Sequence, residues 1–142
     1  LNVLIYDKFS AKLKNKNKFE SLSLKTLLKK SDIISLHLPL SKQTKNLINK
    51  SAFLSMKKKP IIINTSRGFI VNEKDLIDAY NKNLISGFAL DVFENEPVKR
   101  KFLKKINKEM NCILTPHISG ITHQSNIRVS DFIVDKVIDF FN

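Results

Sequence analysis

Short apolar runs and amphipathic segments alternate along the chain. The apolar runs predict strands at residues 2–6, 19–22, 33–38, 61–63, 87–92 and 112–114. Apolar residues at helical spacing, with capping residues before several segments, predict helices at 23–30, 51–56, 73–81, 99–109 and 122–141. Strands that alternate with helices form parallel sheets with right-handed crossovers. The pattern therefore predicts one α/β domain over residues 1–142, built on a doubly wound parallel sheet.

Two of these strands lack the alternation expected of a sheet with one solvated face. The runs 33–38 and 61–63 are mostly apolar, which is typical of strands covered on both faces. The last helix also carries a set of apolar residues available for burial, namely Ile127, Phe132, Ile133, Val137, Phe140 and Phe141. We therefore expect both strands and this helix to be covered by packing.

The strand at 61–63 ends in a polar turn. Asn64, Thr65 and Ser66 lead to Arg67, and Gly68 allows the backbone to turn away. Ligands of open α/β sheets bind at the carboxyl ends of the strands, and a guanidinium can bind a carboxylate or phosphate through two parallel bonds. Arg67 is therefore a candidate anion-binding residue, and the alternative is a surface arginine that caps the end of a strand.

Five of the predicted strands finish with a polar side chain, at or just beyond the carboxyl end of the strand. These side chains are Asp7, His37, Arg67, Asp91 and His117. Each alone has an ordinary explanation as a turn or capping residue, but the carboxyl ends of parallel strands share one edge of a sheet, so together they indicate a site. Asp7 is placed to accept hydrogen bonds from the ribose hydroxyls of an adenosine, which favours NAD over NADP as the cofactor.

Arg67, Glu96 and His117 supply complementary chemistry. An imidazole exchanges protons near neutral pH, and a carboxylate bonded to its other ring nitrogen fixes the tautomer. An arginine can hold a substrate carboxylate through two bonds and polarise the neighbouring carbonyl. This set suits hydride transfer between a nicotinamide and a 2-oxo acid, in which the cofactor carries the difficult step.

A formal charge of +12 raises the possibility of nucleic-acid binding. The charge is almost entirely lysine spread along the chain, since Arg67, Arg100 and Arg128 are the only arginines. Aromatic residues are not interleaved with the lysines, and no nucleic-acid-binding motif is present. We therefore expect solvated lysine-rich faces and no nucleic-acid partner.

One cysteine and the absence of a long apolar segment limit the class further. Cys112 cannot form an internal disulfide or a Cys-based metal cluster, so we expect no metal site and a reducing, cytoplasmic location. No apolar run approaches the roughly 18–20 residues that cross a bilayer, so no membrane contact is expected. The chain of 142 residues is long enough to form a core.

Four motifs occur in order along the chain: SDIISLHLPL at 31–40, NTSRG at 64–68, ALDVFENEP at 89–97 and TPHISG at 115–120. With Thr44 beyond the first motif, they resemble the signatures of the D-isomer-specific 2-hydroxyacid dehydrogenases. The resemblance extends from Asn2 to the last helix. It implies a Rossmann-like domain that binds NAD, and a small 2-hydroxy or 2-oxo acid as the substrate.

The resemblance also implies a role for each matching residue. Arg67 binds the substrate carboxylate and carbonyl, and His117 is the acid/base with Glu96 as its partner. Asp7 holds the adenosine ribose, and Asp91 holds the nicotinamide carboxamide. The other residues expected to contact the cofactor, together with Arg67 and His117 themselves, are His37, Pro39, Thr44, Thr65, Ser66 and Gly120.

Some residues fall outside this correspondence. Glu94 is expected to be a solvated loop residue, and His123 a residue of the first helical turn without a catalytic role. Ser119 stands where the family usually has glycine, which would crowd the cofactor side of its loop. The segment 98–108 is more basic than the family pattern, so the resemblance does not define its contacts.

The family's glycine-rich phosphate loop is not found in this sequence, because no glycine precedes Gly68. We therefore expect the C-terminal part of a cofactor-binding domain, inactive alone, without the family's substrate domain, and able to form a homodimer. The basic surface favours 3-phosphoglycerate as the 2-hydroxy acid, and the alternative is a glyoxylate or hydroxypyruvate reductase. A corepressor-like protein that senses NAD(H) is a further alternative, which a turnover assay would distinguish.

Overall fold

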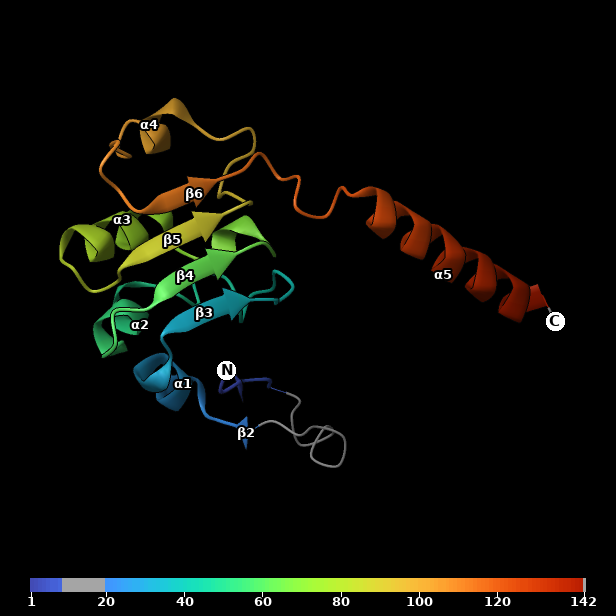
Figure 1. The fold of residues 1–142 in the computed structure, drawn as a ribbon, viewed down its shortest axis with the longest axis horizontal. Helices are drawn as coiled ribbons and strands as arrows, with labels where there is room; N and C mark the ends of the chain where they lie inside the picture. The colour runs from blue at the N-terminus through green and yellow to red at the C-terminus, as the bar shows by residue number, and fades with distance from the viewer. Residues whose placement is uncertain (9–19, 142) are drawn as a thin grey trace.

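The computed structural model describes residues 1–8 and 20–141, and it contains two parallel sheets (Figure 1). The first residue of the strand predicted at 19–22 lies outside this described part. In the two-stranded sheet, β1 (Leu4–Ile5) pairs with β2 (Glu20–Ser21). The four-stranded sheet follows chain order, with β3 (Ile33–Leu36), β4 (Ile61–Asn64), β5 (Gly87–Leu90) and β6 (Cys112–Leu114). The parallel α/β architecture predicted from the pattern is therefore confirmed.

Helices connect the strands as predicted, with one shortened. They are α1 (Leu24–Lys30), α2 (Lys50–Ser55), α3 (Glu73–Asn81), α4 (Arg100–Leu103) and α5 (His123–Phe141), with a short 3-10 helix, η2 (Gly68–Ile70), after β4. The helix predicted at 99–109 ends at Leu103. Its basic residues recur four positions apart, as Arg100 with Lys104 and Lys101 with Lys105, and like charges at this spacing disfavour a longer helix.

Side-chain caps fix the starts of three helices. Ser23 accepts a hydrogen bond from the Thr26 amide before α1, and Asn49 accepts from two amides at the start of α2. Asn72 accepts from the Asp75 amide before α3. These caps satisfy donors that the helix itself leaves unpaired. The capping residues that the sequence places before several helices are therefore confirmed at Ser23 and Asn72.

One face of the four-stranded sheet forms the core. Alternate residues of neighbouring strands lie in register, so that Ile34, Ile62 and Phe88 form a buried row. The helices α1, α2 and α3 contact one another in sequence over the core. Their buried side chains include Leu28, Phe53, Leu76 and Ile77. This packing holds the strands rigidly and so positions the loops at their carboxyl ends.

The opposite face of the sheet is open at its two outer strands. Ile33 on β3 is 55% exposed and Ile113 on β6 is 67% exposed. The prediction that the strand at 33–38 is covered on both faces is therefore wrong for β3. The physical reason is that α1, α2 and α3 pack as one layer, so residues of the other parity lack a covering helix in the described part of the chain.

The terminal helix α5 projects away from the sheet (Figure 1). None of its residues is buried, and its apolar side chains from Ile127 to Phe141 are exposed. The expected burial of this helix is therefore not found, because no described element packs along it. Among the residues that the structure describes, no helix has both the length and the hydropathy needed to cross a bilayer.

The carboxyl ends of β3, β4, β5 and β6 lie along one edge of their sheet (Figure 1). The predicted convergence of polar strand ends therefore applies to these four strands. Asp7 differs, because it follows β1, which pairs with β2 and not with β3.

Candidate active site

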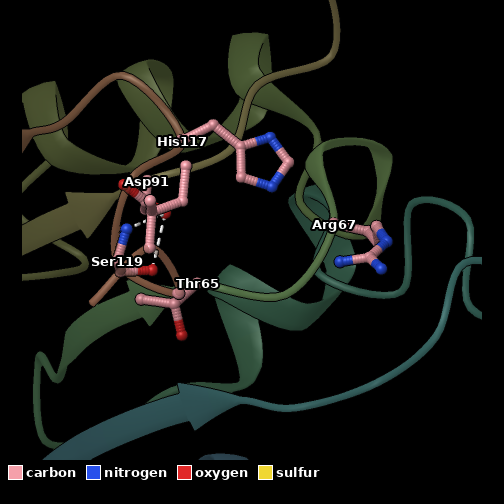
Figure 2. A pocket seen from close by; sticks show the side chains of 7 residues that line it. Thr65, Arg67, Asp91, His117 and Ser119 are labelled. Carbon is pink, nitrogen blue, oxygen red and sulfur yellow. Dashed lines mark hydrogen bonds between the residues drawn. The ribbon is translucent and has the colours of Figure 1, made fainter. Parts of the chain in front are cut away.

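A cavity of about 590 Å³ lies at the carboxyl edge of the four-stranded sheet (Figure 2). Loops that follow β4, β5 and β6 all contribute to its wall. The lining residues are Thr65, Arg67, Asp91, His117, Ser119, Gly120 and Ile121. Its volume falls within the range of small-molecule sites. Five of the residues predicted from sequence as site residues therefore share one cavity, namely Thr65, Arg67, Asp91, His117 and Gly120.

Asn64 shapes the turn that carries Arg67. This fully buried side chain accepts hydrogen bonds from the Ser66 amide at 3.1 Å and the Ser66 hydroxyl at 2.8 Å, and it donates to the Arg67 carbonyl at 2.9 Å. The guanidinium donates one bond to the Ser66 carbonyl at 2.6 Å and is otherwise exposed at the cavity. Sequence reasoning assigned Asn64 no function. The signal was its position at a strand end, where asparagine commonly bonds the backbone two residues ahead.

Gly68 brings this turn against the loop that follows β5. A Cβ atom built on Gly68 would lie 1.8 Å from the Phe93 carbonyl oxygen and 2.8 Å from the Glu94 amide nitrogen. The two backbones therefore touch, and only glycine fits between them.

His117 and Glu96 form a hydrogen-bonded pair beside the cavity. Nδ1 of His117 lies 2.7 Å from one Glu96 carboxylate oxygen, and the other oxygen accepts from the Phe93 amide at 3.1 Å. The bond with His117, followed by the bond from Phe93, lowers the pKa of Glu96 below its usual value. Because Glu96 engages Nδ1, Nε2 is left as the nitrogen that can exchange a proton with a ligand. The imidazole projects toward the side of the cavity where Arg67 lies (Figure 2).

The backbone of His117 is held in an unusual conformation. Its φ is 56°, in the left-handed region that few non-glycine residues adopt. The neighbouring carboxylate of Asp91 fixes this loop through four donors. Thr115 Oγ1 and the Ile118 amide donate to one oxygen at 2.5 and 2.9 Å, and the Ser119 amide and hydroxyl donate to the other at 3.0 and 2.6 Å.

The charge of Asp91 is stabilised although the residue is only 3% exposed. Burial alone raises the pKa of Asp91, but the hydrogen bonds from Ser119, Thr115 and Ile118 outweigh it and lower the pKa to about 2. These four donors occupy all the lone-pair positions that a carboxylate offers. A contact between Asp91 and a carboxamide, as predicted, requires one of these bonds to be exchanged. That role stays a prediction.

Asp91→Asn is expected to destabilise the fold by about 1–3 kcal/mol near neutral pH, because an amide turns its own donor toward hydrogen-bond donors. Since the folded pKa lies below the ordinary value of 3.8, the charged carboxylate stabilises the fold above about pH 4, and this is lost as pH falls toward 2. Thermal unfolding at several pH values should show that the difference in melting temperature between wild type and variant becomes smaller as the pH falls from about 4 toward 2. Asp78→Asn, at an exposed position, is the control. A difference in melting temperature between wild type and Asp91→Asn that stays constant with pH would contradict the prediction.

Several other predicted residues lie outside the cavity wall. His37 Nε2 is 2.8 Å from the Ser35 hydroxyl, and Thr44 donates to the Pro39 carbonyl at 2.6 Å within its own turn. Ser66 bonds Asn64 as described, and Asp7 follows β1 in the separate two-stranded sheet. The cofactor contacts expected of His37, Pro39, Thr44, Ser66 and Asp7 stay predictions.

One expectation about a neighbouring residue changes. Glu94 is not a solvated loop residue, because it is half-buried and its carboxylate accepts a bond from the Glu73 amide at 2.9 Å. Ser119 directs its hydroxyl to Asp91 and lines the cavity, and its crowding of the cofactor side stays a prediction. His123 is the first residue of α5, as expected. Within the described part of the chain, no group of three or more His, Cys, Asp or Glu side chains is arranged to bind a metal ion.

Comparison with protein families decides the relationship. The family model of the D-isomer-specific 2-hydroxyacid dehydrogenase NAD-binding domain matches residues 1–119. The chain belongs to this family. It is 44% identical over 114 residues to an (S)-sulfolactate dehydrogenase from Chromohalobacter salexigens, covering 80% of this chain and 36% of that protein. It is 38% identical over 141 residues to a hydroxypyruvate reductase from Blautia hydrogenotrophica, covering 99% of this chain and 43% of that protein.

Solved structures of the 2-hydroxyacid dehydrogenase family share the fold. A D-lactate dehydrogenase from Aquifex aeolicus, crystallised with NAD and lactic acid, matches with a TM-score of 0.81 and 35% identity. The match covers 99% of this chain and 46% of that one. The chain thus has the Rossmann-like fold of the family's NAD-binding domain, and it spans less than half the length of each of these three relatives.

Proposed function

We propose that this chain supplies the acid/base pair and the anion-binding residue for hydride transfer between NAD(H) and a small 2-oxo or 2-hydroxy acid. The observation that carries the proposal is the 2.7 Å bond between His117 Nδ1 and Glu96, beside a cavity that Arg67 also lines. The pair provides proton transfer, and the guanidinium provides recognition of the acid.

The described residues fit a bound nicotinamide cofactor. The cavity lies at the carboxyl edge of a parallel sheet, where dinucleotides bind in related folds. A Cβ atom built on Gly120 would meet nothing within 4 Å, so this part of the wall leaves open space. We expect Thr65 and Gly120, which line the cavity, to contact the cofactor there. When bound, NAD(H) supplies or accepts the hydride.

The residues of the chain provide the remaining steps. One N–H of Arg67 bonds the Ser66 carbonyl, which leaves the other guanidinium donors for the carboxylate and carbonyl oxygen of the acid. In reduction, the carbonyl carbon receives the hydride while its oxygen takes the Nε2 proton of His117, so that C=O becomes CH–OH. Glu96 accepts a hydrogen bond from the Nδ1–H group of His117, and its negative charge stabilises the imidazolium before Nε2 gives up its proton. In oxidation, neutral His117 removes the hydroxyl proton.

Hydroxypyruvate is the substrate that we propose, in preference to the phosphorylated acid expected from the overall charge. Arg67 is the only permanently cationic side chain among the described residues that line the cavity. One guanidinium matches the single carboxylate that hydroxypyruvate presents. The similarity to a hydroxypyruvate reductase over 99% of the chain supports the same choice.

A substrate panel tests the proposal on the full-length gene product that contains these 142 residues. NADH absorbance would be followed with hydroxypyruvate, glyoxylate, pyruvate and phosphohydroxypyruvate. We expect the highest kcat/KM with hydroxypyruvate. A preference for phosphohydroxypyruvate would overturn the choice of substrate. NADH binding without turnover of any acid would replace the dehydrogenase by an NAD(H)-sensing function.

Light scattering on the same sample tests the predicted homodimer.

Arg67→Lys is expected to lower kcat/KM for the acid by about 10–100-fold, because lysine keeps the charge but loses the fork that binds a carboxylate through two bonds. The loss should appear in KM, because the carboxylate is bound in the ground state, and also in kcat, because the carbonyl oxygen gains charge in the transition state and loses a donor. Arg100→Lys, on the exposed side of α4, is the matched control. Equal kcat/KM for Arg67→Lys and the control would exclude Arg67 as the anion-binding residue.

A further inference from the structure

The side chains that meet at the cavity come from separate loops. Arg67 lies in the turn after β4, and Glu96 lies in the loop after β5. Asp91 fixes the loop of His117 to the end of β5, and Glu96 bonds His117 directly. Direct hydrogen bonds therefore fix His117 and Glu96 relative to each other. The position of Arg67 relative to this pair depends instead on contacts between the turn and the loop.

Two carboxylates connect these segments reciprocally. The Glu73 amide donates to Glu94 Oε1 at 2.9 Å, and the Glu94 amide donates to Glu73 Oε1 at 2.6 Å. Glu73 is the first residue of α3, directly after the turn and η2, and Glu94 lies two residues before Glu96. The Glu73–Glu94 pair therefore joins the Arg67 side of the cavity to the Glu96 side.

The pair lies beside the contact made by Gly68. There the backbones of Gly68 and Phe93 touch so closely that no Cβ atom fits. A small movement of the Arg67 turn would therefore move the loop after β5, and the reverse also holds, because closely packed atoms leave no free space to absorb a shift. The two hydrogen bonds of the pair hold this contact in a single register.

Helix capping does not account for the arrangement. Asn72 already caps α3 by accepting from the Asp75 amide at 2.9 Å. The Glu94 carboxylate accepts from the Glu73 amide, which is also a helix-end donor. The Glu73 carboxylate, however, turns away from its own helix and accepts from the Glu94 amide, 21 residues along the chain. The return bond stabilises the loop after β5, not the helix.

The pair also brings two like charges together in a half-buried place. Burial raises the pKa of Glu73, the Glu94 amide lowers it, the Glu94 charge raises it again, and Lys105 lowers it, with a net rise. A neutral side chain could accept the same bonds without this repulsion. Ionisable groups held at such a cost cluster at functional sites.

We propose that Glu73 and Glu94 are positioning residues that set Arg67 relative to the Glu96–His117 pair, so that recognition of the acid and proton transfer act on the same bound molecule. The inference rests on the proposed function. It assigns a role to two residues that do not line the described cavity.

Alanine and glutamine variants of the full-length gene product test the inference. Glu94→Ala and Glu73→Ala should each lower kcat/KM for hydroxypyruvate by about 10–100-fold, because a displacement of about 1 Å in a catalytic group has effects of this size. Glu94→Gln and Glu73→Gln retain the acceptor oxygen and should restore most of the activity. The double alanine variant should lose about as much as either single variant, since both remove the same connection.

Asp75→Ala is the matched control. Its carboxylate accepts from the Lys50 amide at 2.8 Å at the same end of α3, but it joins α3 to α2 and contacts neither loop of the cavity. We expect Asp75→Ala and Glu94→Ala to lower the melting temperature similarly, and only Glu94→Ala to lower kcat/KM strongly. If Glu94→Ala lowers the melting temperature but leaves kcat/KM equal to that of Asp75→Ala, the positioning role is excluded.

A second readout separates failure of the inference from failure of the proposed function. If the wild-type protein turns over none of the acids, the dehydrogenase proposal fails, and NMR then tests the inference alone. Glu94→Ala should shift the side-chain resonances of both Arg67 and His117, whereas Asp75→Ala should leave both unchanged. Shifts confined to the neighbours of residue 94 would overturn the inference.

Discussion

His117→Ala is expected to lower kcat for reduction of the 2-oxo acid by about 10²–10⁴-fold, the usual contribution of a positioned acid/base. The variant loses the proton donor at Nε2 and leaves the Glu96 carboxylate without the imidazole that it bonds at 2.7 Å. Binding of NADH should change much less, because His117 contributes one of several residues along the cavity. Steady-state kinetics with hydroxypyruvate and a fluorescence titration with NADH measure the two effects separately.

His123→Ala is the control for this experiment, because His123 is exposed at the start of α5 and lines no part of the described cavity. Its kinetics should match the wild type. A His117→Ala protein that retains most of its kcat would assign the proton transfer to another group. Equal losses in the two variants would indicate a general effect of removing a histidine from this part of the chain.

Gly68→Ala is expected to destabilise the protein by about 3 kcal/mol or more, the upper part of the range for overpacking. The added methyl group would lie 1.8 Å from the Phe93 carbonyl oxygen, a backbone atom that no rotamer change can move aside. The turn of Arg67 and the loop of Glu96 meet at Gly68. The clash with the added methyl group therefore pushes these two segments apart or unfolds them. Chemical denaturation followed by circular dichroism measures the loss.

Gly120→Ala provides the comparison for stability. A Cβ atom at Gly120 meets nothing within 4 Å, so its unfolding free energy should stay within about 0.5 kcal/mol of the wild type. If the two alanine variants were equally stable, the backbone contact at Gly68 would be looser than the structure places it.

Local chemistry made part of the site predictable. The strand that ends in Asn64 and the turn at Arg67 follow from a β-branched run and a glycine. The pairing of His117 with Glu96, 21 residues away, was implied by the resemblance of their motifs to those of the family. The structure places Arg67 and His117 along one cavity, with Glu96 bonded to His117. Such residues could be found because strand ends in a parallel sheet share an edge whatever the details of packing.

Contacts between distant segments were not predictable in the same way. Glu73 and Glu94 lie 21 residues apart, and nothing local to either glutamate indicates that each accepts the other's amide. The exposure of Ile33 and of α5 was missed for a related reason. Hydrophobic periodicity shows which face of an element is suited to burial, but the covering element is set by tertiary packing.

The direction of α5 has a mechanical consequence. The helix has 19 residues and leaves the domain from the loop that Asp91 holds. At 1.5 Å per residue it is about 28 Å long and stiff, so a rotation of about 10° at its base would carry its far end about 5 Å. The four hydrogen bonds to the buried Asp91 carboxylate fix the loop from which α5 starts. They therefore set the orientation of the helix at a point close to His117.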